Sequence, residues 1–184
     1  MEHFPELHTE RLRLDRPKWT DIPDIVTYAG DIKITEYTRS MPHPYRDEDA
    51  ISWINMVNQG FKNKDNYIFA IREKTEKAFM GGIGLTIDLS NNRAELGYWL
   101  AVPFWNKGYI TEAIKAILKF GFEELHLNKI TAVYIPENIA SGKVMEKNGM
   151  VREAELKDHD RRGDGYTSLF QYGMTQSEYE SLST

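Results

Sequence analysis

The feature that most constrains the fold is an apolar pattern near the middle of this 184-residue chain. Between residues 110 and 125, apolar or small side chains recur at spacings of three and four, which places them along one face of a helix. They are Ile110, Ala113, Ile114, Ile117, Leu118, Gly121, Phe122 and Leu125. The pattern predicts a long amphipathic helix with one continuous buried face.

This helix follows a predicted strand at 93–101 and a turn that contains Gly108. The first backbone N–H groups of a helix have no intrahelical partner, and the helix dipole adds positive potential at that end. A strand, a glycine turn and a helix N-terminus in this order therefore indicate a binding site for a phosphorylated ligand.

The rest of the chain predicts a mixed sheet. Strands are expected at 12–14, 66–72, 79–89, 93–101, 129–135, 150–157 and 167–175, and further helices at 20–30, 47–60 and 138–148. Short turns between the strands at 66–101 indicate antiparallel pairing. The helical crossover should instead make 129–135 parallel to 93–101. Residues 158–165 are expected to form a polar loop. We expect an α/β (α+β) fold, a mostly antiparallel sheet of about seven strands flanked by about four helices, in one domain spanning 1–184.

Composition excludes several classes of function. The chain has no cysteine, so it has neither a disulfide framework nor a cysteine nucleophile. Its net charge of −5 argues against nonspecific nucleic-acid binding, and its scattered histidines argue against a metal site. The N-terminus lacks the features of a signal peptide, and no apolar run is long enough to span a bilayer. We therefore expect a cytoplasmic protein that binds no membrane.

Four segments together carry a family resemblance. They are Thr9–Leu14 (TERLRL), Glu95–Leu100 (ELGYWL), Trp105–Ala113 (WNKGYITEA) and Asn138–Gly149 (NIASGKVMEKNG). In this order and spacing the chain resembles the GNAT acetyltransferases, in particular the branch of the ribosomal-protein N-acetyltransferases RimJ and RimL. The resemblance covers nearly the whole chain.

The resemblance implies a splayed sheet that binds acetyl-CoA in a V-shaped cleft between the strands at 93–101 and 129–135. Main-chain groups of Leu100, Ala101 and Val102 would pair with the pantetheine arm. Backbone amides of the following turn would hold the pyrophosphate; these belong to Asn106, Lys107, Gly108, Tyr109, Ile110 and Thr111. The family motif has a smaller residue than Ile110 at that position, but backbone contacts tolerate Ile if its side chain turns into the core.

The implied reaction is direct transfer of the acetyl group to an amine. Such an amine is mostly protonated at neutral pH and must lose a proton before it attacks. Strand alternation places Glu95 on one face with Gly97 and Trp99, and Glu95 is our candidate base; the alternative is a solvated carboxylate. Many GNAT enzymes carry a tyrosine proton donor where this chain has Met145.

In the resembled branch a serine one turn after the asparagine replaces that tyrosine, and Ser141 stands at this place. Ser141 is our candidate acid and Asn138 a contact to the donor; both residues also suit a plain helix cap. Lys143 is a candidate partner for CoA phosphates. The region of Glu36, Tyr37 and Trp53 shapes the acceptor pocket in the family.

We therefore expect an acetyl-CoA-dependent N-acetyltransferase without a metal, acting as a monomer or homodimer. The resemblance favours a protein or peptide N-terminal α-amine as the acceptor. A small amine such as a polyamine or an aminoglycoside is an alternative acceptor. A CoA-binding module without catalysis is a further alternative, which Ile110 and Met145 keep open.

Overall fold

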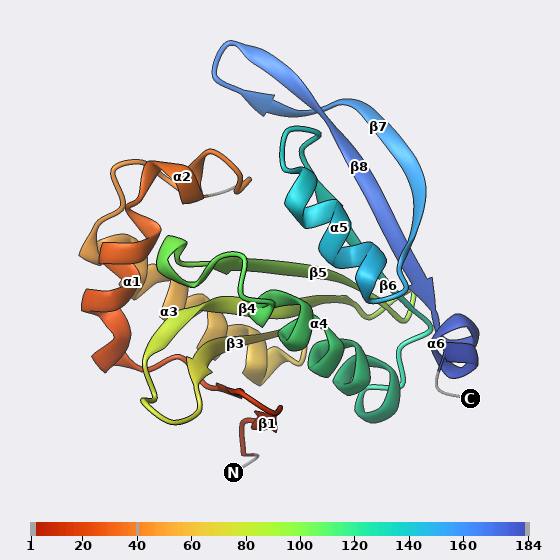
Figure 1. Cartoon of the computed structure of the whole chain (residues 1–184), viewed down its shortest axis with the longest axis horizontal. Helices are drawn as coiled ribbons and strands as arrows, with labels where there is room; N and C mark the ends of the chain where they lie inside the picture. The colour runs from red at the N-terminus through yellow and green to blue at the C-terminus, as the bar shows by residue number, and fades with distance from the viewer. Residues whose placement is uncertain (1–2, 40, 183–184) are drawn as a thin grey trace.

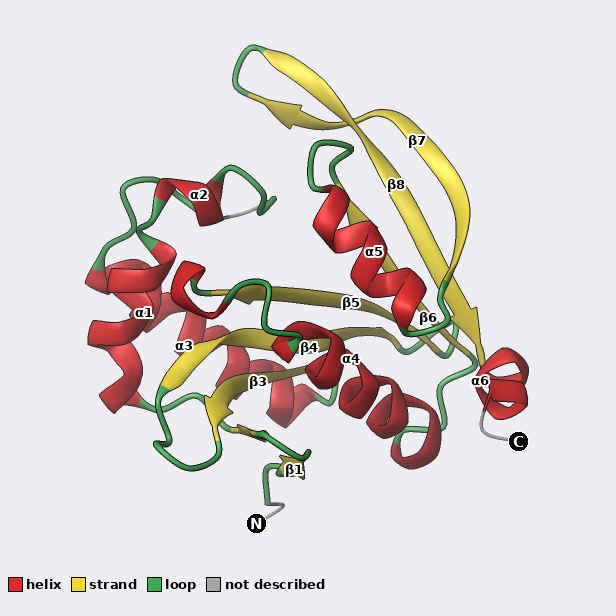
Figure 2. Cartoon of the chain, in the orientation of Figure 1, coloured by secondary structure: helices red, strands yellow, loops and turns green. Residues whose placement is uncertain are grey.

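The strands join into one eight-stranded sheet with the order β1-β2-β3-β4-β5-β6-β8-β7 (Figure 2). The computed structural model describes residues 3–39 and 41–182. The strands are β1 (Leu7–His8), β2 (Leu12–Asp15), β3 (Asn66–Glu73), β4 (Phe79–Asp88), β5 (Arg93–Leu100), β6 (Lys129–Tyr134), β7 (Val151–Arg162) and β8 (Gly165–Thr175). Neighbouring strands pair antiparallel except β5 and β6, which run parallel. The mixed, mostly antiparallel sheet and the parallel crossover are thus confirmed.

Helices cover both faces of this sheet (Figure 1). The helices are α1 (Ile22–Ala29), α2 (Ile32–Thr35), α3 (Asp47–Asn63), α4 (Tyr109–Lys119), α5 (Ile139–Lys147) and α6 (Gln176–Leu182). α1 and α3 lie on one face, and α4 lies on the other. The predicted amphipathic helix is therefore confirmed as α4, which passes into a single π-helical turn at Phe120–Glu124.

Two apolar clusters form the core, one on each face of the sheet. The predicted stripe of α4 packs into the larger cluster, where Ile114, Ile117 and Phe122 are fully buried. The smaller cluster joins α1 and α3 to Phe79 and Trp99. Leu96 and Leu100 belong to the larger cluster and Trp99 to the smaller, so β5 alternates as expected.

The structure corrects the expected loop at 158–165. Most of it is strand: β7 continues to Arg162, β8 begins at Gly165, and Asp160 pairs with Thr167. The polar composition was misleading because the end of this hairpin is exposed and needs no apolar alternation. Three short elements, β1, α2 and α6, were also not predicted.

β5 and β6 separate after only four residue pairs. The pairs run from Arg93–Lys129 to Leu96–Ala132, although β5 continues to Leu100. By strand alternation, the main-chain N–H and C=O groups of Tyr98 and Leu100 face this opening and not β4. α5 follows β6 and lies alongside the opening in Figure 1. The splay expected of the sheet is therefore present.

Candidate active site

A cavity of about 600 Å³ lies where β5, the start of α4, α5 and α2 converge. Polar, aromatic and aliphatic residues line it. Among the predicted site residues, the lining includes Leu100, Asn106, Gly108, Tyr109, Ile110, Thr111, Asn138, Ser141 and Lys143. The fold thus brings nine of the predicted site residues, from β5, one turn and two helices, to a single cavity.

The turn before α4 has the conformation expected of an anion site. Gly108 has φ 80°, and Asn106 has φ 60°, both in the left-handed region. The first intrahelical bond joins Glu112 N–H to the Gly108 carbonyl, so the three preceding N–H groups of the helix have no intrahelical acceptor. A Cβ at Gly108 would be strained by this φ value and would also stand 3.4 Å from the Arg11 guanidinium.

Residues near the N-terminus hold this turn in place, and sequence reasoning did not assign them a role. Glu112 accepts hydrogen bonds from the Thr9 hydroxyl (2.5 Å), Arg11 N–H (2.8 Å) and Arg11 Nε (2.7 Å). Arg11 also donates to the Lys107 carbonyl (2.9 Å) and lies over the Tyr109 ring. Burial acts to raise the pKa of Glu112, but these hydrogen bonds outweigh it and lower the pKa. The segment that leads into β2 is thereby held against the first turn of α4.

At the end of β5, only the edge of the strand that faces away from β4 can offer main-chain groups to the cavity. The Leu100 carbonyl accepts a hydrogen bond from Trp105 Nε1 (2.6 Å), while its N–H faces the opening. Ala101 donates its N–H to the Met80 carbonyl (2.8 Å). Among the described residues, Ala101, Val102 and Lys107 do not line the cavity. Tyr98, which was not predicted to be a site residue, does line it.

The first turn of α5 forms the opposite wall. The Asn138 side chain accepts the Ser141 N–H (3.2 Å), so Asn138 is the N-cap that the sequence predicted. The Ser141 hydroxyl is buried and lies 2.5 Å from the Tyr98 hydroxyl. Lys143 and Lys147 line the cavity and add positive charge. Met145 is buried in the larger core cluster and, among the described residues, is not part of the lining.

Glu95 lies on the other face of β5, with Gly97 and Trp99. It is half exposed and forms an ion pair with Arg39 (3.0 Å), which also binds Asp160 (2.5 Å) at the end of β7. Its side chain is not among the described residues that line the cavity. The hydrogen bond between Asp160 and Arg39 lowers the pKa of Asp160. A Cβ built on Gly97 would meet nothing within 4 Å, so this face of β5 has open space beside Glu95.

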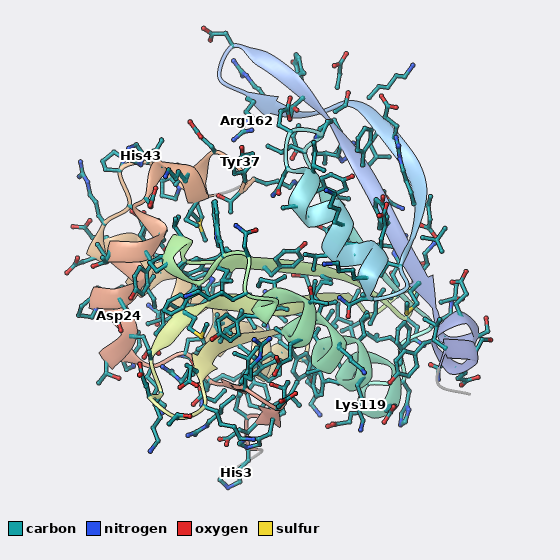
Figure 3. The ribbon with its side chains drawn as sticks, viewed as in Figure 1. His3, Asp24, Tyr37, His43, Lys119 and Arg162 are labelled. Atoms are coloured by element: carbon teal, nitrogen blue, oxygen red, sulfur yellow. The ribbon has the colours of Figure 1, made fainter. Side chains whose placement is uncertain are left out.

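The segment at 35–39 and the end of β7, which Arg39 and Asp160 join, touch at a second place. Arg162 donates to the Thr35 carbonyl (3.4 Å) and to the Glu36 carbonyl. Figure 3 shows Tyr37 and Arg162 where the segment after α2 approaches the hairpin of β7 and β8. We call these contacts, together with Arg39–Asp160, the hairpin clasp. The clasp was not foreseen, because it joins residues more than a hundred positions apart.

Within 3–39 and 41–182, no three histidine or acidic side chains are grouped so that they could hold a metal ion. In the same part of the chain, no helix is both long and apolar enough to cross a bilayer.

Several known proteins are similar in sequence to this chain. Residues 11–151 match the family described as the acetyltransferase (GNAT) domain. The uncharacterized N-acetyltransferase p20 of Bacillus licheniformis is 30% identical over 177 residues, 94% of this chain and 97% of that protein. The [ribosomal protein uS5]-alanine N-acetyltransferase of Escherichia coli is 27% identical over 154 residues, 81% of this chain and 77% of that protein.

Solved structures share the fold. A GNAT-family acetyltransferase from Bacillus anthracis has a TM-score of 0.82 at 28% identity, covering 94% of this chain and 99% of that one. A spermidine N-acetyltransferase from Vibrio cholerae, in complex with CoA and spermine, has a TM-score of 0.80 at 21% identity. Its coverage is 94% of this chain and 99% of that one. Because the family match spans most of the sequence and p20 covers nearly all of it, the chain belongs to the GNAT acetyltransferases.

Proposed function

We propose that this chain, an acetyl-CoA-dependent N-acetyltransferase, acetylates the N-terminal α-amine of a protein or peptide. The cavity that joins the glycine turn of α4 to Ser141 supports the acetyl-CoA half of this proposal. It has helix N–H groups at one end for the pyrophosphate, the part of β5 that does not pair with β6 along one side, and a buried hydroxyl at the other end. An elongated phosphorylated thioester needs this sequence of partners.

The predicted cofactor-binding residues would contact two parts of acetyl-CoA, the pyrophosphate and the pantetheine arm. Backbone N–H groups from Asn106 to Thr111 would hold the pyrophosphate, with Lys143 as a side-chain partner for phosphate. The Leu100 N–H would pair with the pantetheine arm. Ala101 and Val102 fit this role less well, because the Ala101 N–H already donates to Met80 and the Val102 carbonyl already accepts from the Trp105 N–H.

Glu95 would act as the base from the other face of β5. The open space above Gly97 lets an amine approach beside Glu95. The amine would give up a proton, directly or through water, and its nitrogen would attack the thioester carbonyl carbon. The carbon–sulfur bond would then break, with the electron pair remaining on sulfur and Ser141 supplying a proton to it.

The acceptor is proposed mainly on sequence similarity. The uS5-alanine acetyltransferase is 27% identical to this chain over 81% of the chain, whereas the spermidine enzyme is 21% identical to it. One observation favours a polyamine as a second candidate acceptor. Glu95 and Asp160 hold a cation, the Arg39 guanidinium, between them, and a polyamine would bring cationic groups of the same charge.

The test is thiol release from acetyl-CoA with peptides that carry a free N-terminus, with polyamines, and with aminoglycosides. The same peptides with blocked N-termini and an internal lysine are the matched controls. Release with free but not blocked peptides is the expected result. Release with polyamines alone would refute the peptide acceptor and establish the second candidate.

A further inference from the structure

Two hydroxyl groups from different walls meet at the inner end of the cavity. The Tyr98 hydroxyl comes from β5 and the Ser141 hydroxyl from the first turn of α5, and their oxygens are 2.5 Å apart. Ser141 is only 7% exposed. Both residues line the cavity, whereas Met145, at the position where many relatives carry a tyrosine, is buried in the core. A phenol is therefore present beside Ser141, but it comes from the strand and not from the helix.

Either hydroxyl could donate in this hydrogen bond, but a phenol is a stronger acid than an aliphatic hydroxyl, which favours Tyr98 as the donor. Burial raises the pKa of Tyr98 to about 12, so the phenol keeps its proton at neutral pH. A serine hydroxyl has one hydrogen and two acceptor lone pairs. When Tyr98 donates to Ser141 Oγ, the Ser141 hydrogen is free to point into the cavity. The Ser141 carbonyl, 3.5 Å from the Tyr98 hydroxyl, is a weaker competing acceptor.

We propose that Tyr98 is a positioning residue that makes Ser141 an effective proton donor to the departing CoA sulfur. The inference rests on the proposed role of Ser141 in acetyl transfer. As the carbon–sulfur bond breaks, sulfur takes the Ser141 proton, and Ser141 Oγ takes the Tyr98 proton. The resulting phenolate regains, through water, the proton that the acceptor nitrogen loses when it becomes an amide.

The relay solves an energetic difficulty of a lone serine. An aliphatic hydroxyl is a much weaker acid than a phenol, so a serine that gave its proton to sulfur would be left as a strongly basic alkoxide. Transfer from Tyr98 in the same step leaves a phenolate instead. The short distance between the two oxygens means that no side-chain movement is needed for this second transfer.

Tyr98→Phe tests the inference, since it keeps the ring that packs against the core and removes only the hydroxyl. We expect kcat for thiol release to fall about tenfold to a hundredfold, within the usual range for general-acid catalysis, while the KM for acetyl-CoA changes less than about threefold. Tyr134→Phe is the matched control. The Tyr134 hydroxyl approaches Gly142, the next residue of α5, so this variant also removes a phenol near the helix and should keep the wild-type kcat.

A double variant separates action through Ser141 from a purely structural effect. If Tyr98 acts through Ser141, Tyr98→Phe combined with Ser141→Ala should be no slower than Ser141→Ala alone. The solvent deuterium isotope effect on kcat should also be smaller in Tyr98→Phe than in wild type, which loss of packing alone would not cause.

Three results would overturn the inference. A wild-type kcat in Tyr98→Phe, with Ser141→Ala impaired, would remove Tyr98 and leave Ser141 in its proposed role. Multiplied losses in the double variant would show that the two hydroxyls act independently. A wild-type kcat in Ser141→Ala would remove both residues from the mechanism, although acetyl transfer to the acceptor would still be measured.

Discussion

Glu112→Gln is expected to loosen the turn that would hold the donor pyrophosphate. Glu112 accepts three hydrogen bonds from Thr9 and Arg11, and its side chain is 18% exposed. In the variant, one oxygen can keep the bonds to Thr9 and to Arg11 N–H. The new amide group would then face Arg11 Nε–H, donor against donor. One charge-assisted hydrogen bond is lost, which corresponds to about 1.5–3 kcal/mol of the free energy of unfolding.

For a chain of this length, 1 kcal/mol shifts Tm by about 2–4 °C, so the expected decrease in Tm is about 3–12 °C. The KM for acetyl-CoA should rise as well, because Arg11 also fixes the Lys107 carbonyl. Calorimetry and thiol-release kinetics measure the two effects. Glu123→Gln is the control, since its ion pair with Lys119 is long (3.9 Å) and exposed, and the amide oxygen of Gln can keep the hydrogen bond that the Tyr179 hydroxyl donates (2.7 Å). An unchanged Tm together with an unchanged KM in Glu112→Gln would refute the reasoning.

The same variant has a pH signature. The pKa of Glu112 is lowered in the folded protein, so its contribution to stability is fully present above the unfolded value of about 4.3 and is lost as the pH falls through the folded pKa. The difference in Tm between wild type and Glu112→Gln should therefore be constant at neutral pH and should shrink below about pH 4. A difference that grows on acidification would contradict the assigned direction.

Three further perturbations probe the rest of the site. Glu95→Gln should lower kcat at neutral pH about a hundredfold with little change in acetyl-CoA affinity, and an unchanged kcat would remove Glu95 from the mechanism. Gly108→Asp should abolish acetyl-CoA binding measured by calorimetry, through left-handed strain and charge repulsion. Gly163→Ala, which also has a positive φ (59°) but lies at the hairpin end, is its control and should bind normally. Arg39→Gln removes the ion pairs with both Glu95 and Asp160 and should change Tm by no more than about 2–4 °C, because the three side chains are 39%, 49% and 24% exposed; a larger decrease would mean that the Arg39 contact of the hairpin clasp is a major source of stability.

The sequence was sufficient for those parts of the fold and site that depend on local patterns. The α4 stripe, the Gly108 turn and the Asn138 cap each lie within one short segment, and all three have the predicted structure. Crossover geometry likewise predicted the parallel pairing of β5 and β6.

What the sequence did not reveal depends on contacts between distant segments. Alternation placed Tyr98 on a face of β5, but only the packing of α5 brings it to Ser141, 43 residues later. Arg11 and Glu112 meet across 101 positions, and no local pattern marks either as a partner of the other. The prediction for the exposed hairpin end was wrong for a different reason, because strands that bury neither face have no period-two pattern to detect.

The separation of β5 from β6 also has a consequence for cooperativity. Within the described sheet, only four parallel residue pairs join β1–β5 to β6, β8 and β7, although both parts pack into the larger apolar cluster; the two parts can therefore differ in local unfolding free energy. A donor that contacts both walls would couple them, and at a hundred times its dissociation constant it would add about 2.7 kcal/mol to the stability of the bound state. Amide hydrogen exchange should then slow most in β6 and β8 when acetyl-CoA is added. Donor binding at the opening would in this way make the two parts of the sheet unfold more cooperatively.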